Sequence, residues 1–210
     1  MRYRIIFLFA VSTAFPVFCK AITPNAMAPL VVGDIYRPND TSQDMHWREF
    51  ERALEVAKKM GVYAISTDVW WGVAEPTRGS YQWDYYDKIA KTILGKGLKW
   101  VPILSFHQCG GNVGDTCSIP LPKWVWTHYR GKPGIPDENA LKYKSEQGNI
   151  SQETVSVWGT KTVLGDYERF FREFQNHFKK KAKGIAEINI SLGPAGELRY
   201  PSYNSHDKEA

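Results

Sequence analysis

Residues Leu98–Asp115 read LKWVPILSFHQCGGNVGD, and this stretch decides the fold class. Its first part, Leu98–Leu104, is a nearly continuous apolar run of strand length, which is typical of a parallel strand covered on both faces. A dense group of glycine and ionisable residues, His107–Asp115, follows directly. Parallel α/β enzymes bind ligands at the carboxyl ends of their strands, so the stretch indicates both a parallel sheet and the edge that carries its chemistry.

Similar apolar runs recur along the chain. Three more are predicted to be strands: Ala26–Val32, Val62–Val69 and Ile188–Leu192. Apolar residues at helical spacing predict three helices between the strands: Asp44–Met60, Trp83–Leu94 and Val163–Phe178. The alternation of strands and helices predicts βαβ units and therefore an α/β protein with a parallel sheet. Between Ser105 and about Thr160 there is little periodicity, and a long loop after a strand is usually functional.

One face of the last predicted helix is aromatic: Tyr167, Phe170, Phe171, Phe174 and Phe178. We interpret this stripe as core packing rather than as a binding face.

The first 21 residues are expected to be a secretory signal peptide. Arg2 and Arg4 precede an apolar core, and Cys19–Ala21 places small residues before a cut after Ala21. A membrane anchor is the alternative, but the apolar run is short and Pro16 interrupts it. We therefore expect a secreted, extracellular protein that consists of residues 22–210 and has no membrane attachment after cleavage.

The net charge gives no reason to expect a polyanionic partner. The chain has 27 Lys and Arg against 22 Asp and Glu, a formal charge of +5. Cleavage would remove Arg2, Arg4 and Lys20 and no acid, which takes the basic residues from 27 to 24 and the charge to +2. No nucleic-acid partner is expected from so small a charge.

Cleavage would leave two cysteines, Cys109 and Cys117. In an oxidising compartment they are expected to pair and to close a small loop around GGNVGD. A zinc site that includes His107 is the alternative, although no second Cys or His cluster completes four ligands.

The second predicted strand ends in TDVWWG, Thr67–Gly72. Asp68 could accept hydrogen bonds from sugar hydroxyls there, and Trp70 and Trp71 could offer flat faces to a pyranose ring. A helix-capping Asp68 beside packing tryptophans is the alternative.

The glycine-rich loop after the third predicted strand has two interpretations. Its glycines permit close approach of a ligand, and such a loop can close over a substrate, carrying Asp115 while His107 donates to a hydroxyl. The alternative is a surface loop held by its disulfide, with His107 merely packed. A phosphate-binding loop is disfavoured because no Lys or Ser/Thr follows at P-loop spacing.

The last predicted strand leads into GPAGELRYPSY, Gly193–Tyr203, which would bring Glu197 to the same edge. Leu198 and Tyr200 would make its surroundings partly apolar and raise its pKa, as a general acid needs. Arg199 would lower that pKa, and a plain surface ion pair between Glu197 and Arg199 is the alternative.

The motifs HQCGGNVGD and GPAGELRYPSY resemble the two signature motifs of the β-amylases, which release maltose from the non-reducing ends of α-1,4-glucans. The run DVWWG from Asp68 and the segment MAPL at Met27–Leu30 are similar to the same family. The likeness extends from about Met27 to the C-terminus, so it covers almost all of the expected mature chain.

This resemblance implies an inverting glycoside hydrolase on a (β/α)₈ TIM barrel, acting on starch and maltooligosaccharides. Glu197 matches the family's general acid, and Asp68 and His107 match residues that hold the terminal glucose. Asp115 matches the acid on the mobile loop. The pair Cys109 and Cys117 matches a disulfide of bacterial-type members.

Some of those members have a calcium ligand at the position of Glu75, but Gly79 and its neighbours lack the partners, so no metal or other cofactor is expected.

Only about the first four of the eight β/α units are recognisable, so residues 22–210 are expected to form the N-terminal half of the catalytic domain. An inverting enzyme needs a second carboxylate roughly 6.5–9.5 Å from the first. In β-amylases that general base comes from a later part of the barrel. We therefore expect a truncated hydrolase that lacks full activity. A secreted, non-catalytic glucan-binding protein is the alternative function.

Overall fold

A computed structural model describes residues 22–110, 117–144, 147–156, 159–191 and 193. The expected signal peptide, Asp115 and Glu197 lie outside these ranges. Within them, four parallel strands form one sheet in the order β1-β2-β3-β6. Their bounds are Asn25–Met27 for β1, Ala64–Trp70 for β2, Lys99–Ser105 for β3 and Asn189–Ser191 for β6.

The pairing of the central strands aligns their carboxyl ends. β2 and β3 pair in parallel from Ala64 opposite Lys99 to Trp70 opposite Ser105. β6 joins β3 near its end, with Ser105 opposite Ser191. The residues that end β2, β3 and β6 therefore lie along one edge of the sheet, as the sequence predicts.

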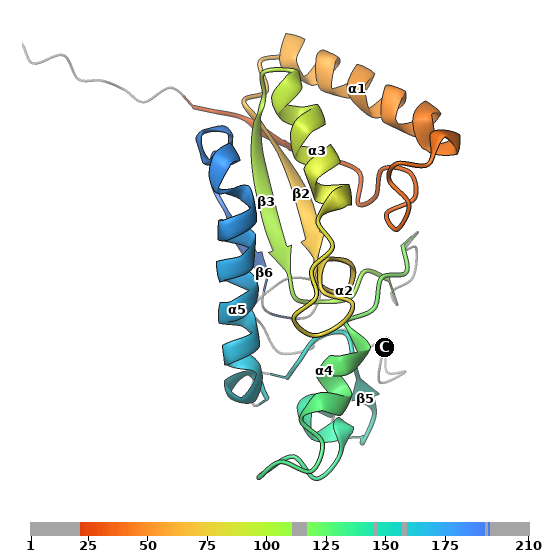
Figure 1. The fold of residues 1–210 in the computed structure, drawn as a ribbon, viewed down its shortest axis with the longest axis vertical. Helices are drawn as coiled ribbons and strands as arrows, with labels where there is room; N and C mark the ends of the chain where they lie inside the picture. Colours follow the sequence, from red (N-terminus) through yellow and green to blue (C-terminus); the bar gives the residue numbers. More distant parts are fainter. Residues whose placement is uncertain (1–21, 111–116, 145–146, 157–158, 192, 194–210) are drawn as a thin grey trace, which may run out of the picture.

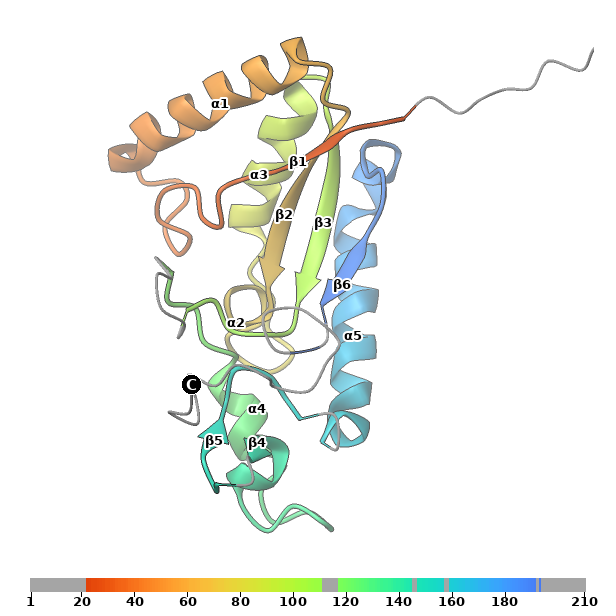
Figure 2. The same cartoon turned by 180° about the vertical axis from the view of Figure 1, so that it is seen from behind.

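Three long helices alternate with these strands and lie on the same side of the sheet (Figures 1 and 2). They are α1 (Asp44–Lys59), α3 (Asp84–Gly95) and α5 (Thr160–Phe178). Aromatic contacts join neighbouring helices. Trp47 of α1 lies 5.9 Å from Tyr85 of α3, and Trp83, just before α3, lies 5.7 Å from Phe170 of α5.

The core lies between these helices and the sheet. Trp100 of β3 is fully buried, and its ring centroid lies 5.1 Å from that of Phe178. Its indole Nε1 donates to Thr67 Oγ1 at 2.8 Å, so the polar atom of this large side chain is satisfied. The predicted aromatic stripe is core packing: Tyr167, Phe170, Phe174 and Phe178 are buried, and Phe171 is partly buried.

The insert between β3 and α5 contains more regular structure than its sequence predicts. It holds a short helix, a 3₁₀ turn and a small hairpin: α4 (Lys123–His128), η2 (Glu138–Leu141), β4 (Tyr143–Lys144) and β5 (Ile150–Ser151). These elements are too short to give a periodic signal. Two other short elements are α2 (Trp71–Ala74), directly after β2, and η1 (Thr41–Gln43). A further 3₁₀ segment, η3 (Lys179–Gly184), continues α5.

The first strand is shorter than the predicted Ala26–Val32. Beyond its end, Ala28 still donates to the Ser66 carbonyl at 3.0 Å. Pro29 has no N–H with which to continue the ladder. The amide of Val32 instead donates to the Tyr85 hydroxyl of α3 at 2.7 Å, which turns the chain away from β2.

None of the helices in the described ranges has the length and apolar character that a membrane crossing requires.

The outer strands of the described sheet expose apolar side chains. Met27 of β1 is 52% exposed, Ile188, just before β6, is 48% exposed, and Ile190 of β6 is 50% exposed. Each of these strands has one neighbour among the described strands. Apolar strands with an unpaired edge tend to pair with further strands.

We expect the chain to self-associate through these strands. Light scattering after size exclusion should give a mass above that of the 24.0 kDa monomer at micromolar concentrations. The double variant I188K/I190K should shift the distribution toward monomer. The control variant V56K, at an exposed position of α1, should not. A monodisperse wild-type monomer would contradict the prediction.

Candidate active site

Asp68 of β2 is held at the carboxyl edge of the sheet. Its side chain is 9% exposed, and Oδ1 accepts a hydrogen bond of 2.6 Å from the hydroxyl of Ser105, the last residue of β3. Asp68 lies within a strand, three residues before α2 begins. The helix-capping alternative is therefore wrong, and the carboxylate is positioned by the neighbouring strand.

His107 follows β3 by two residues and is held by β6. Its Nδ1 lies 2.7 Å from the hydroxyl oxygen of Ser191, the last residue of that strand. The imidazole also meets the ring of Trp70 edge-on, at 5.1 Å between centroids. Contacts from β2 and from β6 thus fix the ring from two directions.

The two serines are register partners on adjacent strands, Ser105 opposite Ser191. Together they bring Asp68 and His107 to one edge of the sheet. Sequence reasoning missed both serines. Their position could have revealed them. Side chains alternate along a strand, so a serine that ends a strand faces the same side as the residue two places before it.

Burial shifts the pKa of both candidate residues. It raises the pKa of the Asp68 carboxyl above its usual range, and the hydrogen bond from Ser105 partly opposes this shift. It lowers the pKa of His107 to about 4, because the partly buried ring loses hydration and favours its neutral form. At neutral pH, His107 is therefore an uncharged hydrogen-bonding group.

The two tryptophans after Asp68 are buried rather than offered to solvent. Trp70 is 2% exposed and Trp71 is 1% exposed. Trp71 packs edge-on against Phe106 at 5.2 Å and against Trp124 at 5.2 Å. The expectation that both rings present faces to a sugar is therefore wrong, and the packing alternative describes them. Gly72 serves the same packing, because a Cβ there would collide with the Pro120 carbonyl oxygen.

A disulfide joins Cys109 and Cys117, whose Cα atoms are 5.6 Å apart. The amide and carbonyl of Cys109 also pair with those of Ile119, so both ends of the loop are fixed. Gly110 has φ +100°, and a Cβ there would collide with the Cys117 carbonyl oxygen. The zinc alternative fails, because both sulfur atoms are in the disulfide and the described residues contain no group of His, Cys, Asp and Glu suited to a metal ion.

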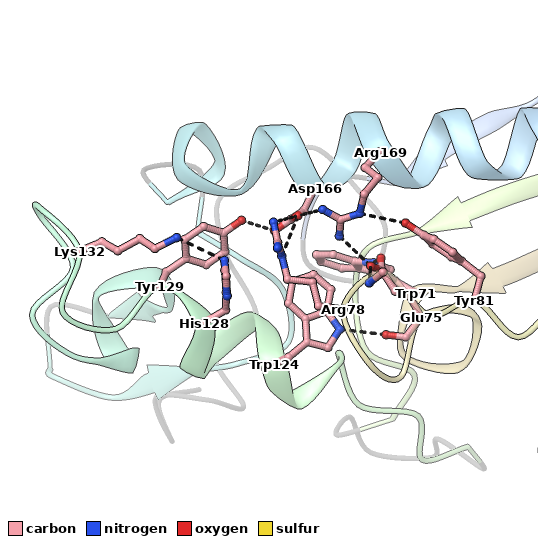
Figure 3. A network of polar contacts seen from close by, with 11 residues as sticks. Trp71, Glu75, Arg78, Tyr81, Trp124, His128, Tyr129, Lys132, Asp166 and Arg169 are labelled. Atoms are coloured by element: carbon pink, nitrogen blue, oxygen red, sulfur yellow. Dashed lines mark hydrogen bonds and ion pairs between the residues drawn. The ribbon is translucent and has the colours of Figure 1, made fainter.

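A second polar cluster lies beside this edge, between α2, α4 and α5 (Figure 3). Its centre is Glu75, which is fully buried. Glu75 accepts hydrogen bonds from Trp71 Nε1 at 2.8 Å and from Arg169 Nη2 at 2.7 Å. Sequence reasoning weighed Glu75 only as a calcium ligand and missed Arg169.

Glu197 and Asp115 are not placed with the other two candidates, since both lie outside the described residues. Gly193, which is described and buried, follows β6 by two residues. The structure therefore brings together Asp68 and His107 of the four predicted site residues.

The fold is a parallel sheet with helices along one side, and an acid and a histidine lie at the carboxyl edge of that sheet. This combination is typical of barrel-type α/β enzymes. The model of glycosyl hydrolase family 14 matches residues 31–208. The chain therefore belongs to glycosyl hydrolase family 14.

Individual relatives agree with this assignment. A thermophilic β-amylase of Thermoanaerobacterium thermosulfurigenes is 41% identical over 199 residues, which cover 91% of this chain and 34% of the relative. A β-amylase of Bacillus cereus is 40% identical over 202 residues, which cover 90% of this chain and 36% of that protein. The chain thus spans about a third of the length of these relatives.

A solved structure supports the fold. The catalytic domain of a β-amylase from Paenibacillus polymyxa superposes with a TM-score of 0.73 at 36% identity, covering 90% of this chain and 42% of that one. The predicted α/β fold of the TIM-barrel class is confirmed, and the four described strands correspond to part of such a barrel.

The lowered pKa of His107 has a measurable consequence. In an NMR titration its ring should titrate at about 4 in the folded chain, against the ordinary 6.5 in the same chain unfolded in urea. The unfolded chain then binds the proton at higher pH than the folded one. His107 therefore does not reduce the free energy of unfolding well above pH 6.5, and it lowers that free energy as the pH falls from 6.5 toward 4.

The size of this loss follows from about 1.4 kcal/mol per pKa unit, which gives roughly 3–3.5 kcal/mol for the whole shift from 6.5 to about 4. The variant H107Q should therefore flatten the fall in unfolding free energy between pH 6.5 and 4. Asp68, whose pKa is raised, changes the free energy of unfolding in the opposite direction as the pH falls, but it is present in both wild type and H107Q. A folded-state pKa near 6.5 would show that the ring is solvated rather than buried.

Proposed function

We propose that this chain supplies the sugar-binding edge and the general acid of an inverting, exo-acting hydrolase of α-1,4-glucans that releases maltose. The observation that carries the proposal is the placement of Asp68 and His107 at one sheet edge, each held by a serine from the next strand. The relatives support it, since those named above are β-amylases.

In this proposal, Asp68 and His107 hold the terminal glucose of the substrate. The Asp68 carboxylate, whose Oδ1 accepts a hydrogen bond from Ser105, accepts a further hydrogen bond from a sugar hydroxyl. Because Nδ1 of His107 is bound to Ser191, its Nε2 faces the sugar. When Ser191 donates to Nδ1, the ring proton lies on Nε2, which then donates to a hydroxyl oxygen. Burial of both groups strengthens these bonds because water competes less.

Glu197 and Asp115 are proposed to act with this edge. Glu197 follows β6 in sequence and would protonate the leaving glycosidic oxygen as general acid. Asp115 would arrive with the loop that the disulfide between Cys109 and Cys117 anchors. Closure of that loop would exclude water and complete the set of contacts with the sugar.

The attack itself requires a second carboxylate that activates water on the opposite face of the sugar. We assign no residue of this chain to that role, because Asp68 and Asp115 both serve binding. We therefore propose that the chain alone binds glucans and does not hydrolyse them.

Binding and hydrolysis can be tested on the same sample. Titration calorimetry of the chain with maltose should show binding, and incubation with soluble starch should release no maltose. D68N should weaken binding by about tenfold or more, because one hydrogen-bonded charge is worth roughly 1.5–3 kcal/mol. D44N, at an exposed aspartate of α1, should bind like wild type.

Each outcome decides one part of the proposal. Maltose release by the chain alone would refute the absence of a general base. Absence of maltose binding would refute the sugar-binding edge. If D68N binds maltose as tightly as wild type, the sugar binds at a site other than Asp68 of β2.

Secretion is proposed from the sequence of residues 1–21, and the intact mass of the protein in the culture medium of its host tests it. A mass of this chain less residues 1–21 would show that the secreted protein is a true truncation, from which we expect no maltose release. A mass about twice as large would identify a longer hydrolase. In that longer protein E197Q should remove most turnover while preserving glucan affinity, and undiminished turnover would rule out Glu197 as the acid.

A further inference from the structure

Two carboxylates beside the sugar-binding edge are buried and have to be compensated. The side chain of Glu75, which follows α2, is 0% exposed, and that of Asp166 on α5 is 1% exposed. Burying an ionised carboxylate is strongly unfavourable unless a cation or several hydrogen-bond donors accompany it. The identity of the cation therefore decides how this part of the fold is stabilised.

One guanidinium bridges both carboxylates (Figure 3). Arg169 Nη2 donates to Glu75 Oε1 at 2.7 Å, and Nη1 donates to Asp166 Oδ1. The third nitrogen, Nε, donates to the Tyr81 hydroxyl at 3.0 Å. All three nitrogens of Arg169 are therefore engaged, and they connect α5 to two positions of the segment between α2 and α3.

The remaining contacts of Glu75 also come from donors. Trp71 Nε1 donates to Oε2 at 2.8 Å, and the Gly79 amide donates to Oε1 at 2.7 Å. The backbone carbonyl of Glu75 accepts a hydrogen bond of 3.0 Å from Trp124 Nε1. Glu75 thus joins the start of α2, the turn that follows α2, and α4.

Asp166 is surrounded in the same way. Arg78 Nη2 donates to its Oδ1 at 2.8 Å, and the Tyr129 hydroxyl donates to its Oδ2. Burial opposes ionisation of Asp166, but the hydrogen bonds from Arg78, Tyr129 and Arg169 outweigh it and hold its pKa below the usual range. Two carboxylates and two guanidiniums therefore balance in charge within the cluster.

This donor set does not fit the calcium ion that family resemblance places at Glu75. Calcium takes six to eight oxygen ligands at about 2.3–2.6 Å. Here N–H and O–H hydrogens point at Glu75 and Asp166, and a cation could approach only by displacing Arg169. Among the described residues, no group of three or more His, Cys, Asp or Glu side chains could hold a metal ion.

We propose that Arg169 takes the place of a structural cation and is a positioning residue for the sugar-binding edge. Glu75 holds Trp71, which packs 5.2 Å from Phe106, the residue before His107. Trp70, the residue before Trp71, meets His107 at 5.1 Å. The guanidinium thus fixes the corner after β2, without a metal ion, against the segment that carries His107.

The stability of the full chain tests the metal-free clamp. The melting temperature of wild type should be the same in EDTA and in millimolar calcium chloride. R169Q, which leaves two buried carboxylates without their shared cation, should lower it by roughly 6–20 °C in both conditions. R172Q, which removes an exposed arginine of the same helix, should leave it unchanged. A calcium-dependent rise in wild type, or an R169Q protein as stable as R172Q, would overturn the proposal.

R169K tests the positioning role and covers the case in which R169Q does not fold. Lysine keeps the charge but cannot span three partners, so R169K should fold in both conditions with an intermediate melting temperature. Its affinity for maltose should be lower by about tenfold, whereas R172K should bind like wild type. An R169K protein with wild-type affinity would refute the positioning role.

This second measurement rests on the proposed function, and the two can fail separately. If wild type binds no maltose, the sugar-binding edge is refuted while the melting temperatures still decide the clamp.

Discussion

The parallel pairing of β2 with β3 is the constraint on which the other features depend. Its register, Ala64 opposite Lys99 to Trp70 opposite Ser105, brings both strands to an end at the same edge. Side chains alternate along a strand, so one pairing sorts them into two sets. Asp68 and Ser105 meet on one face, while Trp100 and Thr67 meet on the other. A slip of one residue would exchange the two sets and separate Asp68 from its serine.

The two faces of the sheet have different roles in the fold. The helix side is dry and aromatic, and the rings of Trp100, Phe106 and Phe174 fill it. The other side holds short hydroxyl side chains whose donors and acceptors point at Asp68 and His107. The first face supplies the hydrophobic stabilisation that offsets the cost of burying polar groups on the second. The raised pKa of Asp68 and the lowered pKa of His107 are both consequences of that burial.

Much of this arrangement could be predicted from sequence, because it follows from local pattern and one topological rule. Apolar runs gave the strands, and residues directly after parallel strands share an edge, which is why Asp68 and His107 could be placed together. Trp70 and Trp71 were ambiguous, since an aromatic residue at a strand end looks the same whether it packs or binds. The contact between Glu75 and Arg169 spans 94 residues, and no local spacing encodes it.

α5 couples the core to the corner after β2. Phe170, the neighbour of Arg169, is fully buried against Trp83, so the backbone that carries the guanidinium is fixed by core packing. A bound metal ion exchanges with solvent, and the order it imposes depends on its concentration. A guanidinium attached to a packed helix is always present at its site. In the proposed clamp, the order of the corner therefore depends on the integrity of the core rather than on the supply of an ion, and the corner and core are expected to unfold together.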